Sequence, residues 1–266
     1  MAVDNDDKLL QKWCKDVDVD YKLARKLKAK IFPLHEEAHK QLGYKFDKAY
    51  NEQRIGTEIR QDNAKTILLL LKKLNPDAFS IKENGIITLH LEYLTLVEGL
   101  FSTRINFLIF ILISNGHDLY SSRKGGYAIT LTDIEEVNLG FKLKFLGEHG
   151  FSNLISNKVD IKLRNSVAHL FYEIDADKSI KFGKKRITQS EYRKLYIKLR
   201  HVTFALHLIN LLYYKRFESM MSPRVTKFDK IKCSCGYENI VPNIKHPPKV
   251  EPLTCTNCGK PIKNGK

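Results

Sequence analysis

The sequence has few cysteines and prolines, and it lacks a nucleotide-binding loop, a secretory signal and a membrane-spanning apolar run. The 266 residues include five cysteines, eight prolines and one tryptophan. No GxxxxGK[ST] stretch occurs, so a built-in NTPase is not expected. Residues 1–7 are acidic where a secretory signal would be basic and then apolar. The longest apolar run, 107–113, is too short to span a bilayer, and the wider segment 89–113 carries three charged residues. We therefore expect a cytoplasmic protein that does not enter a membrane.

Positive charge is what the chain has in excess. Its formal net charge is +15 and its pI is near 9.5. Such a balance indicates a polyanion partner, although part of the excess is ordinary solvated lysine. Nucleic acid is the leading candidate, and an anionic membrane surface is a distant second. A hydrophobic content of 43% is sufficient for a core of useful size.

Long helical patterns dominate, and no β-hairpin is expected before residue 225. We expect helices over residues 21–43, 57–74, 88–114, 132–150 and 190–217. Thr132 and Glu135 have the spacing of a capping box. Residues 121–126 are expected to form a mobile basic loop, and 178–185 a basic connector or small hairpin. Cys14 is expected to be an ordinary helix residue. These patterns predict an all-α fold with an N-terminal helical extension (1–84), a four-helix bundle (85–221) and a small C-terminal module (222–266).

The most informative stretch is Arg164-Asn165-Ser166-Val167-Ala168-His169. We expect it on a helix that begins after an N-cap at Asp160. Helical spacing predicts a core stripe, which comprises Leu163, Val167, Leu170, Phe171 and Ile174. It predicts that Asn165, His169 and Tyr172 lie on the opposite, polar side, with Arg164 between the two. From spacing alone, an incidental Arg-x4-His on a solvated face is the more ordinary interpretation.

This stretch, late in a helical bundle, resembles the Rx4-6H motif of the HEPN superfamily in its RNxxxH form. The resemblance implies an all-α bundle, a homodimer in which two motif helices face each other, and RNase activity without a metal. It also implies a defence or toxin–antitoxin setting, with an antitoxin or activator protein as a possible partner. Some members of the superfamily are inactive binding proteins.

The chemistry of the residues suits RNA cleavage. RNA supplies its own nucleophile, the 2′-OH, so His169 would take its proton while Arg164 neutralises charge on the phosphate oxygens. The products would be a 2′,3′-cyclic phosphate and a 5′-OH. Asn165 would orient the histidine ring or bind a phosphate oxygen, or it is a simple surface residue. Glu98 and Arg104 would support the site or form a structural ion pair. Tyr172 would stack on a base or lie at a dimer interface.

Four cysteines near the C-terminus form two pairs, Cys233/Cys235 and Cys255/Cys258, with 19 residues between the pairs. Each pair is followed by glycine, and the arrangement resembles the two knuckles of a zinc ribbon. Four thiolates predict a structural Zn²⁺ site, although the first pair is one residue shorter than the usual CxxC. A redox dithiol or an iron–sulfur cluster lacks supporting context. The ribbon would deliver RNA, dock a protein or cap the bundle.

Three functions are therefore compared. The first is a homodimeric, metal-independent endoribonuclease. The second is a non-catalytic nucleic-acid-binding or regulatory protein. Salt-sensitive RNA binding without cleavage would favour it. The third is a protein-interaction scaffold whose charge keeps it soluble.

Overall fold

The computed structural model of the chain describes residues 2–43, 46, 62–70, 84–121, 125–128, 130–175, 177, 179–221, 225–232, 234 and 238–244. The chain divides into two compact units, 1–212 and 213–266. Each is described by itself. The described residues are mostly helical, as the sequence predicts.

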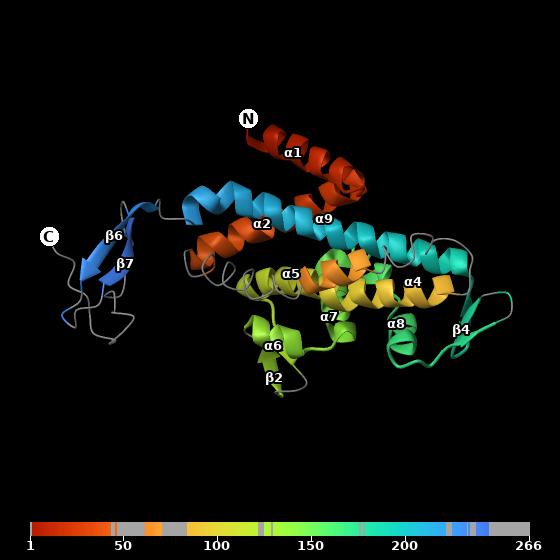
Figure 1. Ribbon diagram of the computed structural model, residues 1–266. Helices are drawn as coiled ribbons and strands as arrows, with labels where there is room; N and C mark the ends of the chain where they lie inside the picture. The colour runs from red at the N-terminus through yellow and green to blue at the C-terminus, as the bar shows by residue number, and fades with distance from the viewer. Residues whose placement is uncertain are drawn as a thin grey trace. The chain divides into compact units, whose positions relative to one another are not determined.

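The helices alternate with short irregular turns (Figure 1). The α-helices are α1 (Ala2–Asp16), α2 (Tyr21–Leu42), α4 (Asn84–Leu94), α5 (Ser102–Ser114), α6 (Leu131–Glu136), α7 (Leu139–Leu146), α8 (Ile161–Ala168) and α9 (Gln189–Met221). Residues 62–70 are helical as well. Two π-helical turns, η1 (Thr95–Phe101) and η2 (Gly147–Phe151), and one 3-10 turn, η3 (Ser156–Lys158), complete the helical elements. The helices expected at 21–43, 88–114 and 190–217 are thereby confirmed.

The continuous helix formed by α4, η1 and α5 makes the core of the first unit. Every residue from Thr103 to Leu112 is buried, because α2, α6 and α7 pack around α5. The segment Thr88–Ser114 is long and apolar enough to cross a membrane, but 78% of its apolar window is buried inside the protein. Such burial is what a core helix shows.

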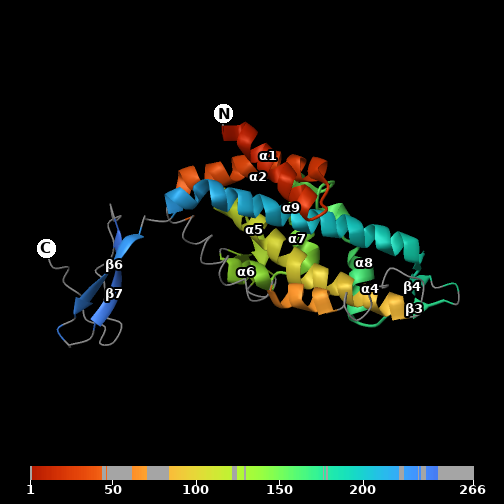
Figure 2. The same cartoon turned by 45° about the horizontal axis from the view of Figure 1, so that its top comes forward.

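Polar contacts join α9 to the rest of the first unit. The hydroxyl of Tyr192 lies 3.0 Å from Nδ1 of His90 in α4. Nη1 of Arg200 donates to Asp18 at 3.2 Å, in the turn between α1 and α2. Within the first unit α9 also runs beside α2 in both views (Figures 1 and 2). The first unit therefore includes the N-terminal helices, and the predicted boundary at residue 85 stays a prediction.

Short strands were missed by the helical prediction. The strands β1 (Leu119–Ser121) and β2 (Gly126–Ala128) form an antiparallel hairpin, so the expectation of no hairpin before residue 225 is wrong. The stretch 121–126 connects them. A second sheet has the order β3 (Glu173–Ile174), β4 (Ile180–Phe182) and β5 (Lys185–Ile187), and its β4–β5 hairpin agrees with one of the two expectations for 178–185. Strands of two or three residues are too short to show a period-2 pattern.

The helix expected at 132–150 is divided in two. Val137 has extended backbone angles, and Asn138 then caps α7 by accepting a hydrogen bond from Phe141 N at 3.0 Å. An asparagine side chain competes with the helix for backbone N–H groups, which favours a new N-terminus. The capping box is also shifted: it consists of Thr130 and Asp133 rather than Thr132 and Glu135.

In the second unit, β6 (Val225–Lys232) pairs with β7 (Glu238–Ile244) as an antiparallel hairpin. Residues 233–237 connect the two strands. The predicted zinc ligands Cys233, Cys235, Cys255 and Cys258 all lie outside the described residues. Among the residues that are described, no group of three or more metal-binding side chains occurs.

Candidate functional site

The first turn of α8 is held by Asp160, as the sequence predicts. Its Oδ1 accepts hydrogen bonds from Lys162 N at 3.0 Å and Leu163 N at 3.1 Å, which satisfies two backbone donors of the helix. Its Oδ2 accepts from Lys185 of β5 at 3.0 Å. Burial raises the pKa of Asp160, but the hydrogen bonds from Leu163 and Lys185 outweigh it and hold that pKa below its usual value. The helix starts at a well-defined point beside α4 (Figure 1).

The last turn of α8 ends earlier than predicted. His169 is the C-cap, and Leu170 follows it in the left-handed region with a φ of 59°. Phe171 N donates to Ser166 O at 2.8 Å and Leu170 N donates to Val167 O at 3.4 Å. These two bonds define a Schellman motif, whose left-handed position is usually glycine. A leucine there has strained backbone angles, and such strain concentrates at functional sites.

The predicted core stripe is therefore wrong in its second half. Leu163 and Val167 are buried. Leu170 is 76% exposed and Phe171 is 75% exposed, because both lie beyond the end of the helix. Ile174 belongs to β3 and is 44% exposed. Two large apolar side chains thus follow His169 on the surface. The sequence has no glycine at this helix end, so the end could not be predicted from it.

Arg164 is held by two neighbours at the surface. Its Nε donates to Oε1 of Glu98 in η1 at 2.5 Å, and its Nη1 donates to Oδ1 of Asn165 at 2.8 Å. The Arg164 side chain is 25% exposed and the Glu98 side chain 47%. An ion pair this exposed contributes only about 0–1 kcal/mol to stability. Its main effect is to orient the guanidinium, and two of the five N–H donors of an arginine are engaged by these two bonds.

Three further residues named in the sequence analysis have side-chain contacts around the motif. Glu98 pairs with the motif arginine and not with Arg104, which is buried in α5. The side-chain oxygen of Asn165 accepts a hydrogen bond from Arg164, so Asn165 orients the arginine. Tyr172 lies beyond the helix, and its ring packs edge-on against the buried His90 with centroids 4.5 Å apart. It does not share a helical face with His169.

His169 is exposed, whereas His35 and His90 are buried and His207 is half-buried. Burial lowers the pKa of His35 to about 3, of His90 to about 4 and of His207 to about 3. Those three rings therefore stay neutral near pH 7. The His169 ring lies 6.2 Å from the Phe171 ring, centroid to centroid, and its backbone N–H donates to Asn165 O at 3.0 Å. At the surface, this imidazole can exchange protons with a bound substrate.

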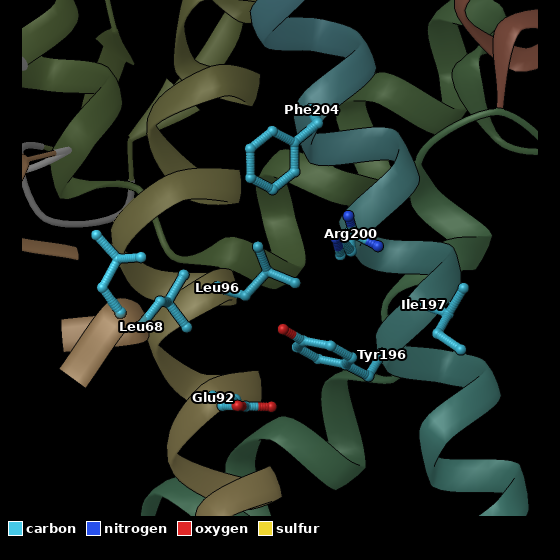
Figure 3. Close-up of a pocket in the computed structure, with 8 residues that line it drawn as sticks. Leu68, Glu92, Leu96, Tyr196, Ile197, Arg200 and Phe204 are labelled. Carbon is cyan, nitrogen blue, oxygen red and sulfur yellow. The ribbon is translucent and has the colours of Figure 1, made fainter. Parts of the chain in front are cut away.

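A separate cavity of about 380 Å³ lies between the helix of residues 62–70, the α4–η1 segment and α9 (Figure 3). Its lining comprises Leu68, Leu69, Glu92, Leu96, Tyr196, Ile197, Arg200 and Phe204. Burial, followed by the charge of Glu92, raises the pKa of Tyr196 to about 12. The lining contains none of the motif residues, so this mostly apolar space is not the site of the motif chemistry.

The candidate site therefore consists of Arg164, Asn165 and His169 on α8, Glu98 on η1 and the exposed pair Leu170 and Phe171. The sequence predicts the first three as site residues, and it wrongly predicts the exposed pair as part of the core. No protein-family model, no curated protein and no solved structure matches this chain.

Proposed function

We propose that this protein is a metal-independent endoribonuclease whose active site is the C-terminal end of α8. One observation carries the proposal: an exposed histidine, His169, follows an arginine that is oriented by Glu98 and Asn165 at the surface of a strongly basic chain. The resemblance of residues 164–169 to the HEPN motif supports the same activity.

His169 and Arg164 have separate tasks in this reaction. The neutral imidazole of His169 takes the proton of the 2′-OH, and the 2′-oxygen attacks the adjacent phosphorus. The bond from phosphorus to the 5′-oxygen breaks, and that oxygen takes a proton from solvent. The guanidinium of Arg164 neutralises the charge that develops on the non-bridging oxygens. The products are a 2′,3′-cyclic phosphate and a 5′-OH.

Glu98 acts as a positioning residue. Its carboxylate binds Nε of Arg164 and therefore fixes the plane of the guanidinium. Asn165 binds Nη1, on another part of the same group. The remaining N–H donors would then bind a phosphate with little rotational freedom to lose, which is the advantage of a preorganised site.

A second copy of the chain is the proposed partner at this end of α8. Leu170 and Phe171 expose large apolar surfaces directly after His169. Burying such a pair against its symmetry-related copy would stabilise a homodimer and bring two motifs together. An antitoxin or activator protein in a cytoplasmic defence setting is a further proposed partner.

The C-terminal cysteines are proposed to hold a structural Zn²⁺. Cys233 and Cys235 come in the sequence between β6 and β7, and two paired strands on either side suit the knuckle of a zinc ribbon. Cys255 and Cys258 would complete the site. When bound, the ion would supply folding free energy to a module with little core of its own. No step of the cleavage involves it.

Binding without cleavage is the alternative function. Nine Lys/Arg residues against three Asp/Glu from residue 222 onward favour phosphate binding by the C-terminal module. In that case Arg164 and His169 would contact phosphate or a partner and perform no chemistry.

The proposal is tested with end-labelled RNA and full-length, zinc-loaded protein in buffer without added magnesium. A second RNA of the same sequence carries 2′-O-methyl groups. We expect fragments that end in 2′,3′-cyclic phosphate from the first RNA and no fragments from the second. Cleavage that requires magnesium, or that leaves 3′-OH ends, would contradict the proposal. Intact RNA with salt-sensitive binding would favour the alternative.

A further inference from the structure

A pair of histidines lies outside the motif, where α5 and η2 meet. His117 follows the end of α5, and His149 lies in η2. Their ring centroids are 4.4 Å apart and their planes cross at 69°. Both rings are partly exposed. The candidate ribonuclease site uses neither residue.

The hydrogen bond of His149 determines which of its nitrogens can bind a ligand. Nδ1 lies 2.8 Å from the backbone oxygen of Phe145. A carbonyl oxygen only accepts hydrogen bonds, so Nδ1 carries the proton and Nε2 of the neutral ring keeps its lone pair. Metal-binding histidines generally have this arrangement, because the bond to the second nitrogen fixes the tautomer and the ring orientation.

Packing holds the His149 ring in place beside His117. The Phe145 ring lies 4.3 Å from the His149 ring, centroid to centroid, on the preceding turn. The backbone turns sharply directly after His149, where Gly150 has a φ of 81°. The imidazole is therefore confined by Phe145 and by His117, with little freedom to lose on binding an ion.

The separation of the rings fits two imidazoles on one metal ion. A nitrogen ligand lies about 2.0–2.1 Å from a bound metal, which puts the metal roughly 3 Å from each ring centre. Two imidazoles in cis positions then have their centres roughly 4.5 Å apart, close to the 4.4 Å found here. Tetragonal nitrogen and oxygen coordination of this kind suits Ni²⁺ and Cu²⁺.

We propose that His117 and His149 form a surface site for a divalent late transition metal, with water at the remaining positions. Within the described part of the chain no third histidine, cysteine or carboxylate joins them in a metal-binding group, so two protein ligands hold the ion. Three charged side chains belong to the same segments: Glu148 is paired with Lys144 at 3.8 Å, Lys30 donates to the Gly150 oxygen, and Asp118 follows His117 in the chain and is exposed. This site is independent of the proposed ribonuclease and of the cysteine pairs.

Ni²⁺ titration of zinc-loaded, full-length protein tests the proposal by calorimetry. Near-UV absorption is recorded in parallel, because thiolate coordination of Ni²⁺ would show there and imidazole coordination would not. The variants are His117→Gln, His149→Gln and the control His39→Gln in the last turn of α2. Circular dichroism checks that each variant is folded. A further variant, His117→Asp, keeps a metal-binding side chain on the exposed segment after α5.

We expect one Ni²⁺ site per chain without a thiolate signal. Its affinity should fall at least about 10-fold in His117→Gln and in His149→Gln, stay unchanged in His39→Gln and be partly retained in His117→Asp. Equal affinity in the wild type and in folded His117→Gln would overturn the proposal. So would Ni²⁺ binding that appears only with thiolate absorption.

Discussion

At its first turn α8 is fastened by Asp160, whereas its last turn ends in exposed and strained residues. Asp160 satisfies two backbone donors and binds Lys185. At the other end, Leu170 adopts a φ of 59° where glycine is usual, and its side chain is 76% exposed. The contacts of Asp160 stabilise the start of α8. The strained, exposed Leu170 does not stabilise its end, and it lies next to His169 on the helix that also carries the oriented Arg164.

The difference between the two ends separates residues that build the helix from residues that the helix presents. A substitution at Asp160 should change stability and leave the chemistry intact. Substitutions at Arg164 or Glu98 should do the reverse, since both side chains are at the surface and their ion pair adds little stability. A substitution of Leu170 by glycine should instead raise stability, because it relieves the backbone strain at this position.

Apart from His169→Ala, the largest effect is expected for Arg164→Ala. Loss of one preorganised donor to a developing oxyanion costs about 10²- to 10³-fold in kcat. Arg164→Lys should recover little of this, because lysine lacks the planar fork that binds Glu98 and phosphate together. Single-turnover cleavage of labelled RNA measures the loss. Activity within twofold of the wild type in Arg164→Ala would show that the reaction does not use this end of α8.

Glu98→Gln should have a smaller effect on the same step. The variant keeps an oxygen for Nε of Arg164 but removes the charge that holds the guanidinium, so kcat should fall about 10-fold. Because a negative charge is lost from the surface, KM for RNA should not rise. Glu37→Gln, in an exposed pair with Lys40 on α2, is the matched control. A rise in KM at constant kcat would mean that Glu98 contacts RNA and does not position Arg164.

Asp160→Ala tests the opposite end. Loss of an N-cap costs about 0.5–2 kcal/mol of the free energy of unfolding. Because the folded pKa of Asp160 is lowered, its contribution is present above the unfolded pKa and is lost as the pH falls through the folded value. Urea denaturation at pH 7 measures the change, and Asp160→Asn should retain most of the stability. An equal loss in both variants would show that the Lys185 pair, and not the cap, holds α8.

Leu170→Gly should give the smallest effect, with the reverse sign. Glycine adopts a φ of 59° without strain, so the free energy of unfolding should rise by about 0.5–1 kcal/mol. Ala168→Gly, two residues earlier and still in α8, should lower it by a similar amount. Sedimentation should show a weaker homodimer for Leu170→Gly. Destabilisation of the monomer by this substitution would contradict the interpretation of Leu170 as strained.

Much of the helical layout could be predicted because long periodic segments carry their own signal. Periodicity and end residues predict helices over 21–43, 88–114 and 190–217, and the structure has them at 21–42, 84–114 and 189–221. The division at Asn138 and the strands β1 and β2 were not predicted. A side chain that competes for backbone N–H groups and strands of three residues leave little trace in a hydrophobic pattern.

The candidate site was predicted in its residues but not in its shape. No glycine or proline marks the end of α8 in the sequence, so helical spacing places Leu170 and Phe171 in the core. Tertiary contacts supplied the rest: Glu98 is 66 residues from Arg164 in the sequence, and its pairing with Arg164 depends on how α4 and η1 lie against α8. A single helix carries no information about such a partner.

The most direct measurement compares RNA cleavage and stability in His169→Ala. The side chain is exposed, so the urea midpoint should equal that of the wild type. Cleavage should fall by at least about 10²-fold, because positioned acid–base catalysis contributes that much. His39→Ala serves as the control and should cleave normally. Cleavage by folded His169→Ala at the wild-type rate would contradict the assignment of the active site to the end of α8.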